Sequence, residues 1–189
     1  MNENDIIKGC LKNNRENQKA LYDYYYGKMY GLCLRYSRNS AEAKEMVHEA
    51  FFKVFAELKN HKPNEPLEPW IKNIMIHTSI EFLRRNRENM IVSTVYANKI
   101  APPETKTSEG ISDEELILNV DKEIILKAVQ ELAPAYRKVF NLYTIEGYSH
   151  KKIAELLNIG EETSGLTLEK AKFNLRKNIK QLIKKKDDK

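Results

Sequence analysis

Apolar residues recur at helical spacing through the first part of the chain. They stand three or four positions apart in two runs, first at Leu21, Tyr25, Met29, Leu32 and Tyr36, and then at Met46, Ala50, Val54 and Leu58. This spacing gathers the apolar side chains on one face of a helix, so it predicts two amphipathic helices. Asn39 or Ser40, between the runs, can cap the second helix, because either side chain can accept a hydrogen bond from a free backbone N–H.

A third helix is predicted after a proline-containing break. Pro63 and Pro66 prevent the second helix from continuing, and helical spacing resumes near Leu67. The residues that this third helix would direct inward are Trp70, Ile71, Ile74, Met75, Thr78 and Phe82. Three or four helices therefore make up the first predicted domain.

The second half of the chain is separated from the first by a polar stretch. Residues 88 to about 120 lack helical spacing, and residues 101–110 have the composition of a linker. Helical spacing returns at Ile124, breaks at Pro134 and resumes; Ser149 can cap a short helix, and a long basic helix follows Gly160. The predicted fold is all-α, with helical domains at 1–87 and 123–189 joined by a flexible acidic linker at 88–122.

Charge follows the same division. Lys and Arg outnumber Asp and Glu by 15 to 11 in residues 1–87 and by 14 to 8 in residues 124–189, whereas the acids lead by 8 to 3 in residues 88–123. Eight cations and no acid occupy residues 170–186. A polyanionic partner would suit this helix, although a solvated helix end with a lysine tail would show the same composition.

Composition also indicates the cellular compartment in which the protein is expected. No window approaches eighteen consecutive apolar residues, and residues 1–7 carry Asn, Glu and Asp before any apolar run, so neither membrane insertion nor a secretory signal is expected. Cys10 and Cys33 are too few for a disulfide framework and too far apart for a CxxC pair. A reducing cytoplasm is the expected location.

Residues 149–175 carry the pattern of a helix-turn-helix. Such a unit needs a small residue facing the partner helix, a left-handed residue in the turn and an apolar residue after it. Ala154, Asn158 and Ile159 meet these needs in order. The following helix would place its N-terminal residues in the major groove and its lysines along phosphates. A helical hairpin with a basic outer face would look similar, so this segment alone leaves the alternative open.

Motifs in both halves together resemble one family. Residues 43–51 are similar to the region-two segment of sigma factors, and residues 70–85 are similar to their promoter-melting stretch. Leu132-Ala133-Pro134, Arg137, Glu146-Gly147-Tyr148-Ser149 and Ile153-Ala154 resemble the region-four pattern. The chain is therefore identified as a member of the sigma-70 family, of the extracytoplasmic-function (ECF) type, with regions two and four only.

This resemblance implies a transcription initiation factor. Such a protein binds RNA polymerase core, through the coiled coil of the largest subunit and through the flap, and directs it to promoter DNA while aiding melting. Control by an anti-sigma factor acting in trans is also implied, and no cofactor is expected. The core-binding positions that match the family are Glu45, His48 and Glu49.

Two further sets of positions match the DNA-binding parts of the family. In region two, the candidates for the minus-ten element are Lys62, Asn64, Lys72, Asn73, His77, Arg84, Arg85 and Arg87. In region four, the candidates for the minus-thirty-five element are Ser149, Glu161, Glu162, Thr163, Leu166, Thr167, Lys170, Lys172 and Arg176. Gly165 and Leu166 replace the Lys and Ser common in the family, so altered upstream recognition is expected.

Other classes of function fit the sequence less well. His48-Glu49 would begin a zinc-binding HExxH helix, but Phe52 stands where the second His is needed. GxGxxG, P-loop and GxSxG motifs are absent from the sequence, so an enzyme is not expected. A helix-turn-helix regulator that binds DNA without polymerase is the alternative, and a helical adaptor is a further rival. Neither needs a second domain with the acidic helix at 43–51.

Overall fold

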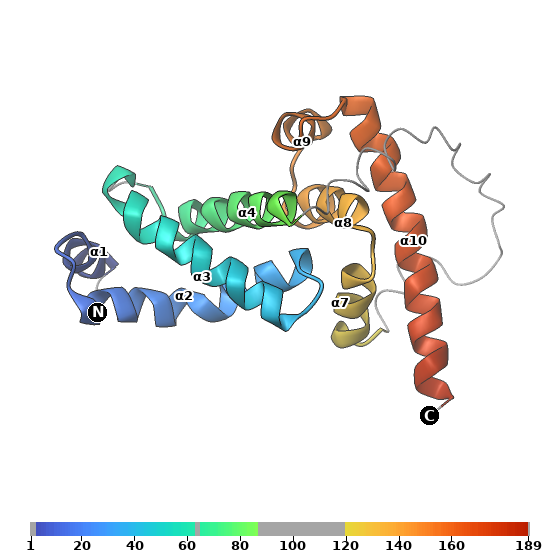
Figure 1. Cartoon of the computed structure of the whole chain (residues 1–189), viewed down its shortest axis with the longest axis horizontal. Helices are drawn as coiled ribbons and strands as arrows, with labels where there is room; N and C mark the ends of the chain where they lie inside the picture. Colours follow the sequence, from blue (N-terminus) through green and yellow to red (C-terminus); the bar gives the residue numbers. More distant parts are fainter. Residues whose placement is uncertain (1–2, 63–64, 87–119, 189) are drawn as a thin grey trace. The chain divides into compact units, whose positions relative to one another are not determined.

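The computed structural model describes residues 3–62, 65–86 and 120–188, in which every regular element is a helix (Figure 1). The chain divides into two compact units, within residues 1–85 and 86–189. The all-α, two-unit prediction is therefore confirmed. Most of the predicted linker, residues 88–119, lies outside the described residues, and the exact domain limits stay predictions. Among the helices described, none is both long and apolar enough to cross a membrane.

The first unit contains four α-helices. They are α1 (Glu3–Leu11), α2 (Arg15–Tyr36), α3 (Ser40–Glu57) and α4 (Leu67–Arg85), with a short 3-10 turn, η1 (Leu58–Asn60), after α3. Helices α2, α3 and α4 pack against one another in all three pairs, and α1 packs against α2 (Figure 1). Asn39, one of the two predicted caps, begins α3 because its side-chain oxygen accepts from the Glu42 N–H at 2.9 Å.

The core of the first unit follows the predicted apolar runs, with one exception. Every residue of the two runs is at most 5% exposed. On α4, however, Trp70 and Ile74 are only half-buried, while Ile71 and Met75 are fully buried. Both half-buried residues line a pocket that Lys53 and Glu57 of α3 also line. The prediction that Trp70 and Ile74 point into the core is therefore wrong.

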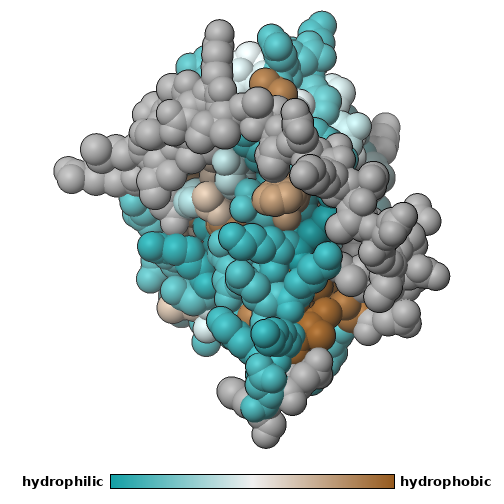
Figure 2. Space-filling model, turned by 90° about the vertical axis from the view of Figure 1, so that its right-hand side faces the viewer, coloured by the Kyte–Doolittle hydropathy of each residue, from teal (hydrophilic) through white to brown (hydrophobic). Residues whose placement is uncertain are grey.

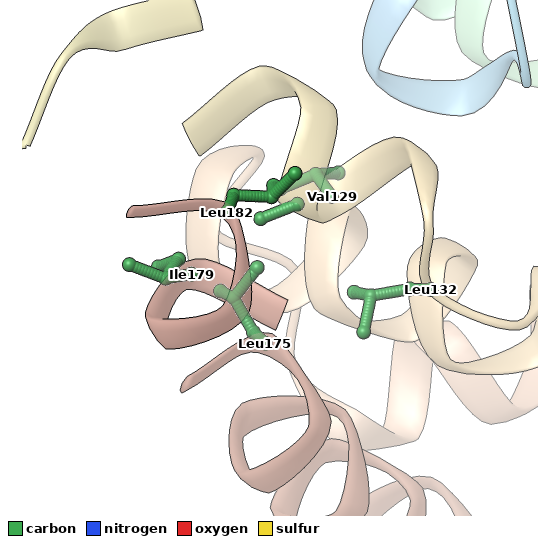
Figure 3. Packing of buried hydrophobic residues seen from close by; sticks show 6 residues of the cluster. Val129, Leu132, Leu175, Ile179 and Leu182 are labelled. Atoms are coloured by element: carbon green, nitrogen blue, oxygen red, sulfur yellow. The ribbon is translucent and has the colours of Figure 1, made fainter. Parts of the chain in front are cut away.

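The second unit is organised around one long helix. Its elements are α7 (Lys122–Gln130), α8 (Pro134–Phe140), a π-helical turn η2 (Asn141–Ile145), α9 (His150–Leu157) and α10 (Glu161–Asp187). Helix α10 packs against α7, α8 and α9. In Figure 3, Val129 and Leu132 lie against Leu175, Ile179 and Leu182 of α10. This cluster fixes the C-terminal half of α10 and leaves its first turns to pack with α9.

A buried arginine joins two short helices of this unit. Arg137 of α8 is fully buried, and its Nη1 donates a hydrogen bond to the Gln130 carbonyl at 2.9 Å. The carbonyl lies at the last residue of α7, where helix carbonyls lack partners within the helix. Arg137 therefore ties α7 to α8 in the interior of the second unit.

Candidate functional site

The three predicted core-binding residues on α3 do not share one environment. Glu45 and His48 are exposed. Glu49 is turned toward α4: its carboxylate pairs with Arg85 and lies 3.7 Å from the Lys53 Nζ, and its side chain is 28% exposed. The structure therefore assigns Glu49 a bridging position between α3 and α4, and Arg85, a predicted phosphate contact, is its partner.

His48 also lines an aromatic groove. It is formed by Tyr22 of α2 and by His48, Phe51, Phe52 and Phe55 of α3, and its volume is about 330 Å³. The Tyr22 and Phe51 ring centroids are 4.6 Å apart, and Phe52 is 77% exposed. Sequence reasoning missed this groove. Its signal was present, because Phe52 and Phe55 stand off the apolar stripe that fills the core.

A second concave surface lies between α3 and α4, and we call it the α4 pocket. Its volume is about 230 Å³, and its lining is Lys53, Glu57, Trp70, Asn73, Ile74, His77, Thr78 and Glu81. The predicted DNA contacts Asn73 and His77 thus face the same pocket as Trp70. The Trp70 ring meets His61 edge-on, with 5.3 Å between the centroids.

Several charged residues in and near the α4 pocket are held in ion pairs. Lys53 donates a hydrogen bond to Glu81, and this bond lowers the pKa of the Glu81 carboxyl. Lys62 is paired with Glu65 at 3.1 Å on the loop before α4. Arg84 is exposed at the end of α4. Asn64 and Arg87, two further predicted contacts, lie outside the described residues.

The helix-turn-helix geometry is present in the second unit. Asn158 adopts the left-handed conformation (φ 53°, ψ 54°), as predicted, and the Ile159 N–H donates to the Ala154 carbonyl at 3.0 Å. Ser149, a predicted DNA contact, caps α9 by accepting from the Lys152 N–H at 3.2 Å. The His150 Nδ1 lies 3.0 Å from the Ser164 Oγ, so the start of α9 is tied to α10.

The structure sorts the predicted DNA contacts of α10 by exposure. Glu161, Glu162, Leu166 and Arg176 are exposed, whereas Thr163, Lys170 and Lys172 are half-buried. Lys172 is paired with Glu169 at 3.0 Å. Thr167 is only 3% exposed. Its assignment as a DNA contact is wrong, because Thr167 shares the stripe of Ser164, Leu168 and Ala171 that faces the interior.

The surface seen from the side of α10 is mainly hydrophilic where residues are described (Figure 2). This agrees with the six exposed cations on the C-terminal half of that helix, which are Arg176, Lys177, Lys180, Lys184, Lys185 and Lys186. Such a row can follow a phosphate backbone.

Comparison with known proteins places both units in one family. The model of Sigma-70 region 2 matches residues 21–89, and the model of Sigma-70 region 4 matches residues 122–172, in that order along the chain. The protein belongs to the sigma-70 family, as an ECF sigma factor. The identification made from the sequence is confirmed, and so is the function in transcription initiation.

Relatives of this sigma factor align along nearly the whole chain. It is 24% identical to the ECF RNA polymerase sigma factor SigW of Bacillus subtilis over 186 residues, which cover 93% of this chain and 96% of SigW. It is 21% identical to the ECF RNA polymerase sigma-E factor of Escherichia coli, with 95% of each chain covered. These relatives are sigma factors, a family without enzymatic activity.

A solved structure has the same fold. The sigma factor RpoE from Bartonella quintana, in a co-crystal structure with the anti-sigma factor NepR, matches with a TM-score of 0.50 and 16% identity, covering 86% of this chain and 96% of RpoE. In the present protein, region two contains the aromatic groove and the α4 pocket, and region four contains the helix-turn-helix.

Proposed function

We propose that this sigma factor binds the coiled coil of the largest polymerase subunit with the outer face of α3. Glu45 and His48 are exposed there, and His48 lines the aromatic groove. An exposed carboxylate complements an Arg-rich coiled coil. Aromatic side chains are enriched at the centres of protein interfaces, where they contribute most of the binding energy. Phe52, the most exposed large apolar side chain described, supplies such an anchor.

Glu49 acts differently in this proposal. Its carboxylate is already shared by Arg85 and Lys53, so it serves the core contact by holding α4 against α3. The two surfaces of region two are thereby kept in a fixed relation, with the polymerase-binding face on α3 and the promoter-binding face on α4.

The α4 face is proposed to hold the displaced strand of the minus-ten element. The α4 pocket offers an indole ring at Trp70, an amide at Asn73 and an imidazole at His77. An unstacked base can stack on an aromatic ring and form hydrogen bonds through its edge. Lys62 lies on the loop before α4, and Lys72 and Arg84 lie on α4 itself. These three cations would contact the phosphates of the strand. Asn64 and Arg87 extend this proposal to positions that the structure does not describe.

Helices α9 and α10 are proposed to bind the upstream promoter element. In a helix-turn-helix, the second helix enters the major groove with its N-terminal residues toward the bases. The exposed Glu161, Glu162 and Leu166 occupy that end of α10. Lys170, Lys172 and Arg176 lie one turn or more beyond Leu166 and would contact phosphates.

Other partners follow from the family. RpoE of Bartonella quintana is bound to an anti-sigma factor in its structure, and we propose that an inhibitor of this class controls the present protein. A cytoplasmic location is part of the proposal, because bacterial core polymerase and promoter DNA lie there. No catalytic activity is proposed.

The observation that carries the proposal is the presence, on one helical unit, of an exposed face on α3 with Glu45 and the aromatic groove, and of a pocket beside α4 lined by Trp70, Asn73 and His77. Transcription reconstituted from the full chain, core RNA polymerase and a genomic DNA library tests it. We expect initiation at a limited set of promoters, and none from core alone. Sequence-specific DNA binding without core binding would instead identify a stand-alone regulator.

A further inference from the structure

We infer that α10 selects its DNA sequence through Leu166 and Glu162, which contact the methyl group of a thymine and the amino group of a cytosine. This inference rests on the proposed binding of upstream promoter DNA by α9 and α10. It goes beyond that proposal because it names the bases and the two side chains that read them.

The exposure pattern of α10 identifies the reading face. Ser164, Thr167, Leu168 and Ala171 are at most 3% exposed and face the interior. On the other side of the helix, Glu162 is exposed and Leu166 is 49% exposed. Residues four apart lie next to each other on a helix surface. Glu162 and Leu166 therefore form one outward-facing pair in the first two turns, where a recognition helix meets base edges.

The chemistry of each side chain limits what it can read. Leucine has no hydrogen-bonding group, and the one apolar feature that bases present in the major groove is the C5 methyl group of thymine. A carboxylate only accepts hydrogen bonds, and the cytosine N4 amino group is a donor that Glu pairs with in this groove. Guanine presents two acceptors there and would repel Glu162.

Gly165 gives the pair access to the groove. Apart from its chain neighbours and the adjacent backbone of α10, no described heavy atom lies within 4 Å of the position that a Cβ would take at Gly165, so packing within the chain does not require glycine there. A glycine lowers helix stability relative to alanine, by about 1 kcal/mol, but it allows another molecule to approach the backbone closely. Beside Leu166, that space lets the leucine side chain reach a thymine methyl group.

Helix geometry fixes the spacing of the two bases. Four residues of α-helix span about 6 Å, at about 1.5 Å per residue. Successive base pairs are about 3.4 Å apart along the duplex. The thymine and the cytosine should therefore stand no more than about two base-pair steps from each other, on the same or on opposite strands.

The test uses holoenzyme made from the full chain and core polymerase. A promoter recovered from the genomic library is randomised over its upstream element only, and templates that bind are selected and sequenced. We expect a thymine and a C·G pair within two steps of each other. That thymine is then replaced by deoxyuridine, which differs only in lacking the methyl group. Loss of the methyl contact should weaken binding about fourfold, the value of one buried methyl or methylene group.

Three variants assign the effect to side chains. Leu166→Ala should bind the thymine and deoxyuridine templates equally. Phe173→Ala is the matched control, because Phe173 is also exposed (47%) on α10 but lies two turns further along; it should keep the fourfold difference. Glu162→Gln should relax selection at the C·G pair by about tenfold, within the range of a specific base contact.

Two results would overturn the inference. One is equal binding of thymine and deoxyuridine templates by the parent; the other is a methyl effect that persists in Leu166→Ala. Failure of the proposed function is distinguishable, since it would appear as no core binding or no promoter-dependent transcription on any template, before the variants are compared.

Discussion

Charge-reversal variants on α3 can distinguish a residue that contacts polymerase from a residue that holds α3 and α4 together within region two. Glu45 is exposed, whereas Glu49 pairs with Arg85 and approaches Lys53. We expect Glu45→Lys to reduce core affinity at least tenfold, because a cation would then face the Arg-rich coiled coil. Its stability should change by less than about 0.5 kcal/mol, as is usual for an exposed position.

Glu49→Lys should lower stability as well. The Glu49 and Arg85 side chains are 28% and 56% exposed, so solvent screens the pair and each attraction contributes at most about 1 kcal/mol. Reversal replaces two attractions by two repulsions, and we expect a loss of roughly 1–2 kcal/mol. For a unit of this size, each kcal/mol corresponds to a decrease in Tm of about 4–8 °C.

A double variant that exchanges the charges of Glu49 and Arg85 tests how Glu49 acts. Glu49→Lys should also weaken core binding, because α4 is then held less firmly against α3. In Glu49→Lys/Arg85→Glu, the ion pair between α3 and α4 is re-formed but the repulsion with Lys53 remains, so stability should recover in part, and core affinity with it. The assays are thermal unfolding by circular dichroism and competition for core polymerase against the labelled parent chain. Glu155→Lys, the same charge change on an exposed residue of α9, is the control for core binding.

Two outcomes would refute this reasoning. Parental core affinity in Glu45→Lys would remove Glu45 from the interface. Recovery of stability without recovery of core affinity in the double variant would mean that polymerase contacts the Glu49 carboxylate directly.

Three further predictions follow from particular side chains. Burial raises the pKa of the Cys33 thiol to about 12 and leaves the residue 0% exposed, so at pH 8 a thiol reagent should label it only after unfolding; rapid native labelling would contradict the structure. Asn158→Gly should keep or raise Tm, whereas Asn158→Val should lower the free energy of unfolding by at least about 1 kcal/mol, because valine is strained in the left-handed conformation. Equal Tm values for the two variants would be inconsistent with that turn. The Lys53 hydrogen bond lowers the pKa of the Glu81 carboxyl, so its stabilisation is present above the unfolded value of about 4.3 and is lost as pH falls through the lowered pKa. Glu81→Gln should therefore make acid unfolding less steep near pH 4, and an unchanged acid limb would count against the pair.

Local physics made much of this protein predictable from its sequence. Apolar spacing located α2, α3 and α4 because a helix buries residues three and four apart. Asn39 and Ser149 begin helices by accepting backbone hydrogen bonds within three residues, and Asn158 tolerates the left-handed turn. Each of these signals depends on neighbours in the chain. The family identification combined such signals from both units.

Tertiary packing alone decided which faces the helices bury. Spacing placed Trp70 and Ile74 with the core residues of α4, and only the packing of α3 beside α4 showed that both line a pocket. The sequence made Thr167 a candidate for contact with the DNA groove, but in the structure its side of α10 is buried in the interior of the second unit. Glu49 and Arg85 are 36 residues apart in the chain, and no local rule pairs side chains at that separation. The aromatic groove likewise requires α2 and α3 side by side, because its residues come from both helices.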